Sequence, residues 1–479
     1  MTNAAKSPNQ GQSAPQEWRR QPSPDERSDA GRAARKAVPR SELADIGPAD
    51  DRDPVGILLA QGEGRVQDLL PIRYGRMVAS PFAFYRGAAA VMASDIGATA
   101  SSGLRSQLCG DAHLSNFGLF ASPERRMVFD VNDFDETLPG PFEWDVKRLA
   151  ASMVIAARQN GVSTSDATDI ARASCQSYRE SMIDLAGRTD LAVWYQRIDI
   201  ENVLANPEIK LSKRGRERLS KNIAKARTKD SEQVFAKIGS AAGGRPHIVA
   251  NPPLIVPLKD VTHIDPDEMQ TRIQKVIEDY AKTLVSDRRV LLGRYEMVDF
   301  AMKVVGVGSV GTRCWITLML GRDETDVLFL QVKEASASVL EPYAGKSSYR
   351  TAGARVVAGQ RLMQASSDIF LGSDRIVGGD GKPRDYYLRQ LKDWKGSADV
   401  ERMSRKTLKQ YGQFCGITLA RAHARSGDRI AMAAYLGKGD SFDRALARFA
   451  TDYAARNAKD HAALDEAIDE GRVVASKGI

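Results

Sequence analysis

The sequence predicts an α+β fold with two lobes, one mainly helical and one rich in β-strands. Residues 291–395 concentrate β-branched runs around glycine turns, whereas the segments on both sides show the apolar spacing of helices. A polar run at 108–118 lies between short apolar runs that are typical of strands. We therefore expect four parts. They are a disordered tail (1–50), a first part of the helical lobe (51–290), a β-rich lobe that ends in a hinge (291–395) and a second part of the helical lobe (396–479).

Composition sets the broad class of the protein. The 479 residues suffice for several domains, and the net charge of +8 is modest for this length. The four cysteines lie far apart without CxxC pairing, so we expect no zinc site and no disulfide framework. No segment reaches the roughly 18 apolar residues that span a bilayer, and the N-terminus has no signal-peptide pattern. We therefore expect a cytoplasmic protein without a membrane partner.

The first half of the chain predicts mostly helices around one hairpin. The tail over 1–50 has many prolines and charges and few apolar residues, which is typical of disorder. Apolar spacing predicts helices at 81–95, 143–160, 165–186 and 268–287, a strand and hairpin over 104–134, and an extended stretch at 248–258. The basic run at 208–229 favours a solvated face, so we consider a nucleic-acid partner unlikely.

The second half begins with strands. Two β-branched runs flank the glycine turn after residue 300, and a third run ends at Lys333. The remaining elements are predicted as a helix at 350–366, a strand at 386–391, a long helix at 404–426 and one or two helices over 441–470.

Polar residues suited to phosphoryl transfer follow one another in the first half. In LCGDAHLSNFG, Asp111 can accept the proton of an attacking hydroxyl, and the Asn116 carbonyl can bind Mg²⁺. Asp133 ends the next strand, where a hairpin returns it beside Asn116. Strand alternation puts Asp135 on the same face as Asp133 and the rival Asp130 on the other. Such residues also cap turns and helices, and each one alone has that simpler explanation.

A glycine string suited to phosphate binding lies in the second half. The segment KVVGVGSVGTR contains Gly306, Gly308, Ser309 and Gly311 between two predicted strands. Glycine lets backbone amides approach phosphate oxygens. A dinucleotide-binding turn would need a helix next, but a strand follows, as in the phosphate loop of kinases. Lys333 then ends a strand in the position of the lysine that binds the α- and β-phosphates in kinases.

These motifs resemble those of aminoglycoside- and choline-kinase-like phosphotransferases, which have a protein-kinase-like fold. GDAHLSNFG is similar to their catalytic loop, NDFDE to their metal-binding strand end, and FEWDVKRLA to the following helix, with Cys109 in place of the usual histidine. The resemblance implies ATP and Mg²⁺ as cofactors, Asp111 as the catalytic base with His113 organising its loop, and metal ligands among Asn116, Asp133 and Asp135. The stretch DYYLRQLKDWKGS resembles the hinge, where the backbone of Arg389, Gln390 and Leu391 would bind adenine.

The resemblance differs from an ordinary kinase in two ways. The catalytic-loop motifs precede the glycine loop, so the order is circularly permuted. The helix expected after Lys333 contains no acidic residue, so we expect Glu334 or, less favourably, Glu341 to hold the lysine.

From about residue 76 to 465 the chain also resembles an uncharacterised bacterial family, domain of unknown function 2252. The hallmarks of that family stand here as SPFAFYRG, GDAHLSNFG, FDVNDFDETLPGPFEWDVKRLA, KVVGVGSVGTR, QVKEA and RQLKDWKGS. The function predicted by the motifs is transfer of phosphate from ATP to an unknown small-molecule or protein hydroxyl. A nucleotide-binding sensor without catalysis and a nucleotidyl (AMP) transferase on the same fold are the alternatives.

Overall fold

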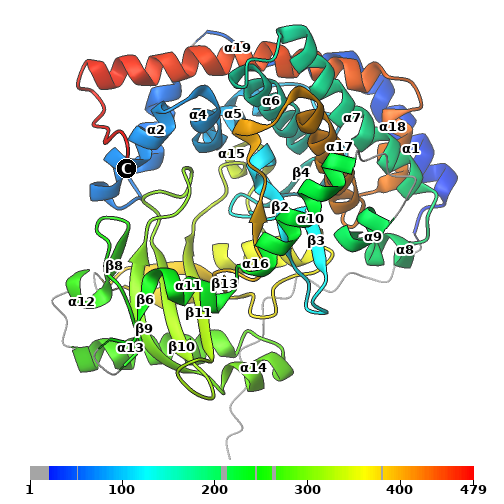
Figure 1. Cartoon of the computed structure of the whole chain (residues 1–479). Helices are drawn as coiled ribbons and strands as arrows, with labels where there is room; N and C mark the ends of the chain where they lie inside the picture. The colour runs from blue at the N-terminus through cyan, green and yellow to red at the C-terminus, as the bar shows by residue number, and fades with distance from the viewer. Residues whose placement is uncertain (1–20, 51, 206–212, 243–244, 262–265, 379–380) are drawn as a thin grey trace, which may run out of the picture.

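The computed structural model describes residues 21–479 apart from 51, 206–212, 243–244, 262–265 and 379–380. Figure 1 shows an antiparallel sheet with its covering helices below and a larger helical part above. We call residues 231–391 the sheet lobe and the remainder the helical lobe. The mixed α+β class predicted from the sequence is confirmed.

The sheet lobe is built on six antiparallel strands. Its strand order is β12-β13-β11-β10-β9-β8, so the three strands that follow one another after residue 295 are neighbours. The strands are β8 (Ile255–Pro257), β9 (Glu296–Lys303), β10 (Cys314–Leu320), β11 (Val327–Ala335), β12 (Gly372–Val377) and β13 (Pro383–Gln390). The register pairs Lys333 with Cys314 on one side and with Tyr387 on the other, so Lys333 lies on a central strand.

Both faces of this sheet are covered by segments that precede residue 293. Helices α13 (Pro266–Ala281) and α14 (Ser286–Leu292) pack on one face, where Tyr280 joins Leu330 in an apolar cluster. Helix α11 (Ser231–Ile238) packs on the other face, where Val234 contacts a second cluster that includes Phe329. The predicted lobe boundary at residue 290 is therefore wrong, because the sheet lobe begins near residue 231.

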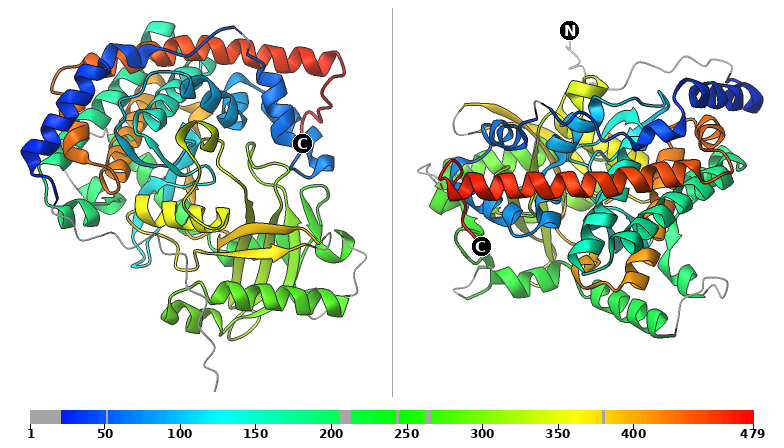
Figure 2. Two further views of the ribbon diagram at one scale, coloured as in Figure 1. Left: turned by 180° about the vertical axis from the view of Figure 1, so that it is seen from behind. Right: turned by 90° about the horizontal axis from the view of Figure 1, so that it is seen from above.

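The helical lobe holds the largest apolar core. Helices α6 (Glu143–Gln159), α7 (Thr164–Ala186), α17 (Arg405–Ala424) and α19 (Ser441–Asp469) pack together, so segments from both ends of the chain share this core. Figure 2 shows α19 crossing the lobe from end to end. The helices predicted at 143–160, 165–186 and 404–426 are confirmed, and 441–470 forms one long helix. The stretch 81–95 is divided at Ala88 into α4 (Pro81–Gly87) and α5 (Ala89–Gly97).

The hairpin predicted over 104–134 is present beside this core. Strand β2 (Phe117–Ala121) pairs with β3 (Met127–Val131), and β1 (Arg105–Leu108) pairs with β4 (Leu138–Pro141). Helix α16 (Ala352–Met363) contacts the sheet and the helical lobe together, and it lies between them in Figure 2. Strand β14 (Gly396–Ser397), which follows the hinge, pairs with β2 and so ties the hinge to the hairpin.

The prediction of disorder over the first fifty residues is wrong for residues 24–44. Helix α1 (Pro24–Ala37) begins with a capping box, in which Ser23 and Glu26 exchange hydrogen bonds, and has Pro24 at its first position. A Cβ on Gly31 would lie 2.1 Å from the Ala431 carbonyl, so α1 packs very closely on α18 (Arg429–Leu436). The composition did not indicate this helix, because its contact with α18 is formed at a glycine rather than by large apolar residues. Residues 1–20 lie outside the described part of the chain.

The remaining short elements connect these units. They are η1 (Arg40–Ala44), α2 (Pro54–Gly62), η2 (Gln67–Leu69), α3 (Leu70–Val78), η3 (Leu114–Asn116), α8 (Asp190–Tyr195), β5 (Ile198–Asp199), α9 (Ile200–Ala205), α10 (Lys213–Arg227), β6 (Gly239–Ser240), β7 (His247–Ile248), α12 (Leu258–Val261), α15 (Glu341–Ala344) and η4 (Val400–Arg402). Over the described residues, no helix combines the length and the apolar character needed to cross a membrane.

Candidate functional site

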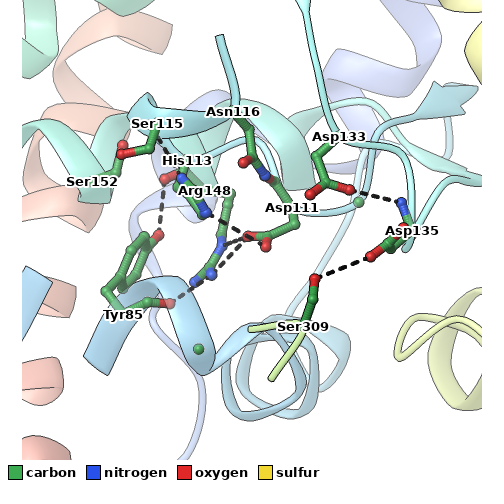
Figure 3. A network of polar contacts seen from close by, with 12 residues as sticks. Tyr85, Asp111, His113, Ser115, Asn116, Asp133, Asp135, Arg148, Ser152 and Ser309 are labelled. Atoms are coloured by element: carbon green, nitrogen blue, oxygen red, sulfur yellow. Dashed lines mark hydrogen bonds and ion pairs between the residues drawn. The ribbon is translucent and has the colours of Figure 1, made fainter. Parts of the chain in front are cut away.

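Residues of both predicted constellations line one cavity, although Lys333 and Gly311 are not among its lining residues. The cavity has a volume of about 280 Å³. Its lining includes the predicted residues Asp111, His113, Asn116, Asp133, Asp135, Gly306, Gly308 and Ser309. In Figure 3 Asp111, Asp133, Asp135 and Ser309 lie close together; the Asp135 amide donates to Asp133 Oδ1 at 3.2 Å, and Ser309 Oγ donates to Asp135 Oδ2 at 3.4 Å.

The loop that carries Asp111 is fixed by its backbone. Gly110 has φ 82°, and a Cβ there would lie 2.2 Å from the Glu136 carbonyl, so only glycine fits. The buried Asp145 carboxylate on α6 accepts hydrogen bonds from the amides of Cys109 (2.8 Å) and Gly110 (3.0 Å). His423 Nε2 on α17 lies 3.2 Å from Asp145. His423 thus supports this carboxylate from another helix.

Asp111 is held by an arginine that the sequence analysis did not predict. Arg148, one turn after Asp145 on α6, contacts Asp111 Oδ1 through Nε at 2.8 Å and through Nη2 at 2.7 Å (Figure 3). The His113 Nε2 atom lies 3.7 Å from Asp111 Oδ2. Burial lowers the pKa of His113 to about 4, so the imidazole is neutral at pH 7. The Asp111 carboxylate therefore has one anchored oxygen and one oxygen that faces the cavity.

Asn116 and Asp133 are brought together by the hairpin. The Asn132 amide donates to the Asn116 carbonyl at 2.8 Å, which extends the β2–β3 pairing by one bond. The Asn116 side-chain nitrogen donates to the Asp111 carbonyl at 2.7 Å, and this leaves the amide oxygen available to a ligand. Burial alone would raise the pKa of Asp133, but Lys333 and Arg389 outweigh it and lower this pKa to about 2. Asp133 is therefore ionised at any ordinary pH.

The rival aspartate of this strand has a different role. Asp130 is buried, pairs with Arg421 on α17 and accepts the Ala365 amide at 3.1 Å. It therefore points toward the core of the helical lobe, on the opposite side from the cavity.

Lys333 is held by Asp135, which corrects the prediction that Glu334 or Glu341 holds it. The buried Lys333 ammonium pairs with Asp135 Oδ2 and lies 3.9 Å from Asp133 Oδ2. The other Asp135 oxygen accepts from Tyr387 at 2.7 Å, so both oxygens have protein partners, and Asp135 as a metal ligand stays a prediction. Glu334 instead pairs with Arg313 at 3.2 Å, and Glu341 accepts from the Ser338 amide at 3.4 Å. Neither glutamate holds Lys333.

Helix α16 contributes an arginine to this arrangement. Arg355 donates to the carbonyls of Asp135 (2.8 Å), Thr137 (2.6 Å) and Ser336 (2.7 Å). The helix thereby fixes the backbone of the Asp135 segment, and the lysine is held indirectly.

The glycine loop is anchored through its carbonyls. Arg65 Nη1 donates to the carbonyls of Gly308 (2.8 Å) and Val310 (2.6 Å), and the Val66 amide donates to Gly311 at 2.8 Å. Gly311 has φ 88°, which favours glycine. Among the described residues the amides of Gly308 and Ser309 donate to no protein acceptor. The loop therefore offers free N–H groups beside the cavity, which is the arrangement that binds phosphate.

Most polar groups of the predicted hinge form hydrogen bonds within the protein. The Gln390 amide donates to Asp368 at 2.8 Å, and the Leu391 amide donates to the Phe329 carbonyl at 2.9 Å. The Arg389 side chain donates to the Asn132 carbonyl at 3.0 Å. The backbone of Arg389, Gln390 and Leu391 is predicted to bind adenine, but the amides of Gln390 and Leu391 are not free for this, because they donate to Asp368 and to the Phe329 carbonyl.

Arg86 is a further cavity residue that the site prediction missed. It belongs to α4, lines the cavity beside Asp111, and has a buried Nε without a partner. Within the described residues its guanidinium makes no hydrogen bond or ion pair. Its segment, SPFAFYRG, is one of the hallmarks of the resembled family, but the apolar residues of that segment are typical of a core helix and do not indicate a site.

The fold and the site together define a mixed α+β protein with an acidic cavity between the glycine loop and the loop that carries Asp111. It belongs to a bacterial family described as "Uncharacterized protein conserved in bacteria (DUF2252)", whose model matches residues 65–467. No curated protein and no solved structure matches the chain.

Proposed function

We propose that this protein is an ATP- and Mg²⁺-dependent phosphotransferase with a kinase-like arrangement in circularly permuted order. The observation that carries the proposal is the shared cavity. Asp111, Asn116 and Asp133 line it from one part of the chain, and the glycine loop lines it from another. Phosphoryl transfer depends mainly on positioning and charge stabilisation, and such a cavity supplies both.

The order of elements in the sheet lobe supports this proposal. Two strands flank the glycine loop, the next strand carries the buried Lys333, and helix α16 and two more strands follow before the hinge. Protein kinases likewise place the glycine loop first and the phosphate-binding lysine on the third strand. Here the catalytic loop precedes the sheet lobe instead of following the hinge. Permutation is tolerated when the joined ends lie at the surface.

The donor atoms fit a magnesium ion. Mg²⁺ prefers hard oxygen ligands and usually takes one or two from the protein, completing its shell with phosphate oxygens and water. Asn116 offers a free amide oxygen and Asp133 an ionised carboxylate, and both line the cavity. In the described part of the chain no three His, Cys, Asp or Glu residues form a complete metal cage, which agrees with a metal shared with phosphates. When bound, Mg²⁺ would neutralise phosphate charge.

The residues in and around the cavity have separate roles in this proposal. The free oxygen of Asp111 orients and deprotonates the acceptor hydroxyl, while Arg148 fixes the carboxylate. Lys333 and the free amides of Gly308 and Ser309 bind the phosphates. Arg86 supplies an unpaired positive charge beside Asp111 that can stabilise the transferred phosphoryl group, since Arg148 is committed to Asp111 and His113 is neutral.

A labelling experiment tests the proposal and separates the alternatives. Purified protein is incubated with γ-labelled or α-labelled ATP, Mg²⁺ and a cell lysate, and hydrolysis without acceptor is measured in parallel. We expect γ-label to be released or transferred, and Asp133→Ala to abolish it. Transfer of the α-label would identify a nucleotidyl transferase. Binding of ATP without hydrolysis or transfer would identify a sensor.

A further inference from the structure

A second cavity lies where the hinge meets the hairpin, and most of its charged lining residues are cations. Its volume is about 180 Å³, several times the roughly 30 Å³ that one water occupies. Five cationic side chains and two carboxylates line it. The cations are Arg125, Arg288, Arg389, Lys392 and Lys395.

The two carboxylates of this cavity are already engaged. Asp368 accepts the amides of Phe370 (2.7 Å) and Gln390 (2.8 Å), and Asp393 pairs with Arg125 at 2.8 Å. Two of the cations, in contrast, have no direct partner. Among the described residues neither Lys392 nor Lys395 has a hydrogen-bonded or ion-paired partner. The lining therefore has five cations against two carboxylates, and the neighbouring Asp133 offsets only part of the charge of Lys395.

Uncompensated cations in a partly closed space are unfavourable unless a ligand neutralises them. Lys395 is half-buried beside Arg389, and burial followed by the charge of Arg389 lowers the pKa of its ammonium to about 7. Burial and the neighbouring Lys237, Lys229 and Lys303 likewise lower the pKa of Lys392. This composition is typical of sites for phosphate groups, which accept several charge-assisted hydrogen bonds at once.

We propose that the hinge cavity is a binding site for a polyphosphate or phosphorylated ligand, with Lys392, Lys395 and Arg389 as its cationic contacts. The site is distinct from the cavity around Asp111, and the proposal stands without the phosphotransferase activity. The phosphates have two possible sources. They belong either to the terminal end of a nucleotide that lies across both cavities or to a separate phosphorylated molecule.

Calorimetric titration with sodium tripolyphosphate tests this site. We expect Lys392→Met and Lys395→Met each to weaken binding on the order of tenfold, because each loses one charge-assisted contact. Lys395→Arg keeps the charge and should retain binding. Lys459→Met on α19, an exposed position away from both cavities, removes the same charge and serves as the matched control. Thermal melting of every variant shows that it is folded.

The Lys333→Met variant and competition with ATP show where tripolyphosphate binds and what kind of ligand the hinge cavity holds. If Lys333→Met abolishes tripolyphosphate binding while Lys392→Met and Lys395→Met bind as the parent does, the anion binds only beside the glycine loop and the proposal is wrong. If the hinge lysines matter and ATP competes with tripolyphosphate, the phosphates of a nucleotide occupy the cavity. If they matter and ATP does not compete, a separate phosphorylated ligand does. Absence of any ATP turnover would count against the proposed function alone.

Discussion

The ion pair between Asp111 and Arg148 allows the role of Asp111 to be tested through stability and activity together. The Arg148 side chain is 4 % exposed and that of Asp111 is 20 % exposed. Asp111→Asn keeps the shape but removes the charge that balances a buried guanidinium. Breaking a buried pair from one side costs about 3–5 kcal/mol, and the partial exposure of Asp111 places the expected loss near the lower end, at about 3 kcal/mol.

A double-mutant cycle isolates this interaction. Arg148→Met should cost less than Asp111→Asn, because the freed carboxylate can be solvated from the cavity. The double variant should recover about 2 kcal/mol relative to the sum of the single losses. Equilibrium unfolding in urea measures the free energies, and variants are compared only where the slope against denaturant is unchanged. Additive losses would show that the charges do not interact, and the assignment of Arg148 would be wrong.

Activity gives the second readout of the same variants. Asp111→Asn should reduce ATP turnover on the order of 10²–10⁴-fold, the usual contribution of a general base. Arg148→Met retains the carboxylate and should lose less. Turnover in Asp111→Asn equal to that of the parent would place the base elsewhere.

Three further predictions follow from the site. The pKa of His113 is lowered to about 4 from its ordinary value near 6.5, so between these pH values the unfolded chain binds a proton that the folded protein does not. The protein should therefore lose up to about 3 kcal/mol of stability as the pH falls from about 6.5 to 4, and urea unfolding of His113→Asn should lack this pH dependence. Gly110→Ala should lower stability by more than about 2 kcal/mol, because the new Cβ adds a clash to the strain of positive φ. Gly103→Ala, at φ 72° with open space around it, should cost only about 1 kcal/mol, and equal losses in thermal unfolding would contradict the close contact at Gly110. Arg86→Met breaks no pair, so it should leave unfolding unchanged and reduce ATP turnover roughly 10²-fold, and unchanged turnover would remove Arg86 from the site.

Sequence patterns predicted the parts of the fold that depend on local spacing. Helices α6, α7 and α17 follow from apolar periodicity, and the hairpin follows from two short apolar runs around a turn. The same patterns could not show which lobe a segment joins. Residues 231–292 look like any helix-rich stretch, but they cover both faces of the sheet that forms after them.

The site residues divide in a similar way. Asp111, Asn116, Asp133 and the glycines lie in short motifs whose spacing is informative. Arg86 and Arg148 lie on helices, where an arginine usually has no more than a surface role. Only tertiary packing brings Arg86 to the cavity and Arg148 to Asp111. The partner of Lys333 comes from the helical lobe, 198 residues earlier, so the acidic residues near the lysine in the sequence could not reveal it.

The most direct test of the proposed function is calorimetric titration of ATP with and without Mg²⁺. We expect ATP binding by the parent protein to depend on Mg²⁺. Lys333→Met should weaken ATP binding on the order of tenfold or more, because a phosphate contact is lost. Asp133→Asn should remove the dependence of ATP binding on Mg²⁺. The Lys333→Met/Asp135→Asn double variant controls for the unpaired carboxylate that the single change leaves. Equal ATP affinity in the parent, both single variants and the double variant, with or without Mg²⁺, would contradict the assignment of this cavity to Mg²⁺ and nucleotide.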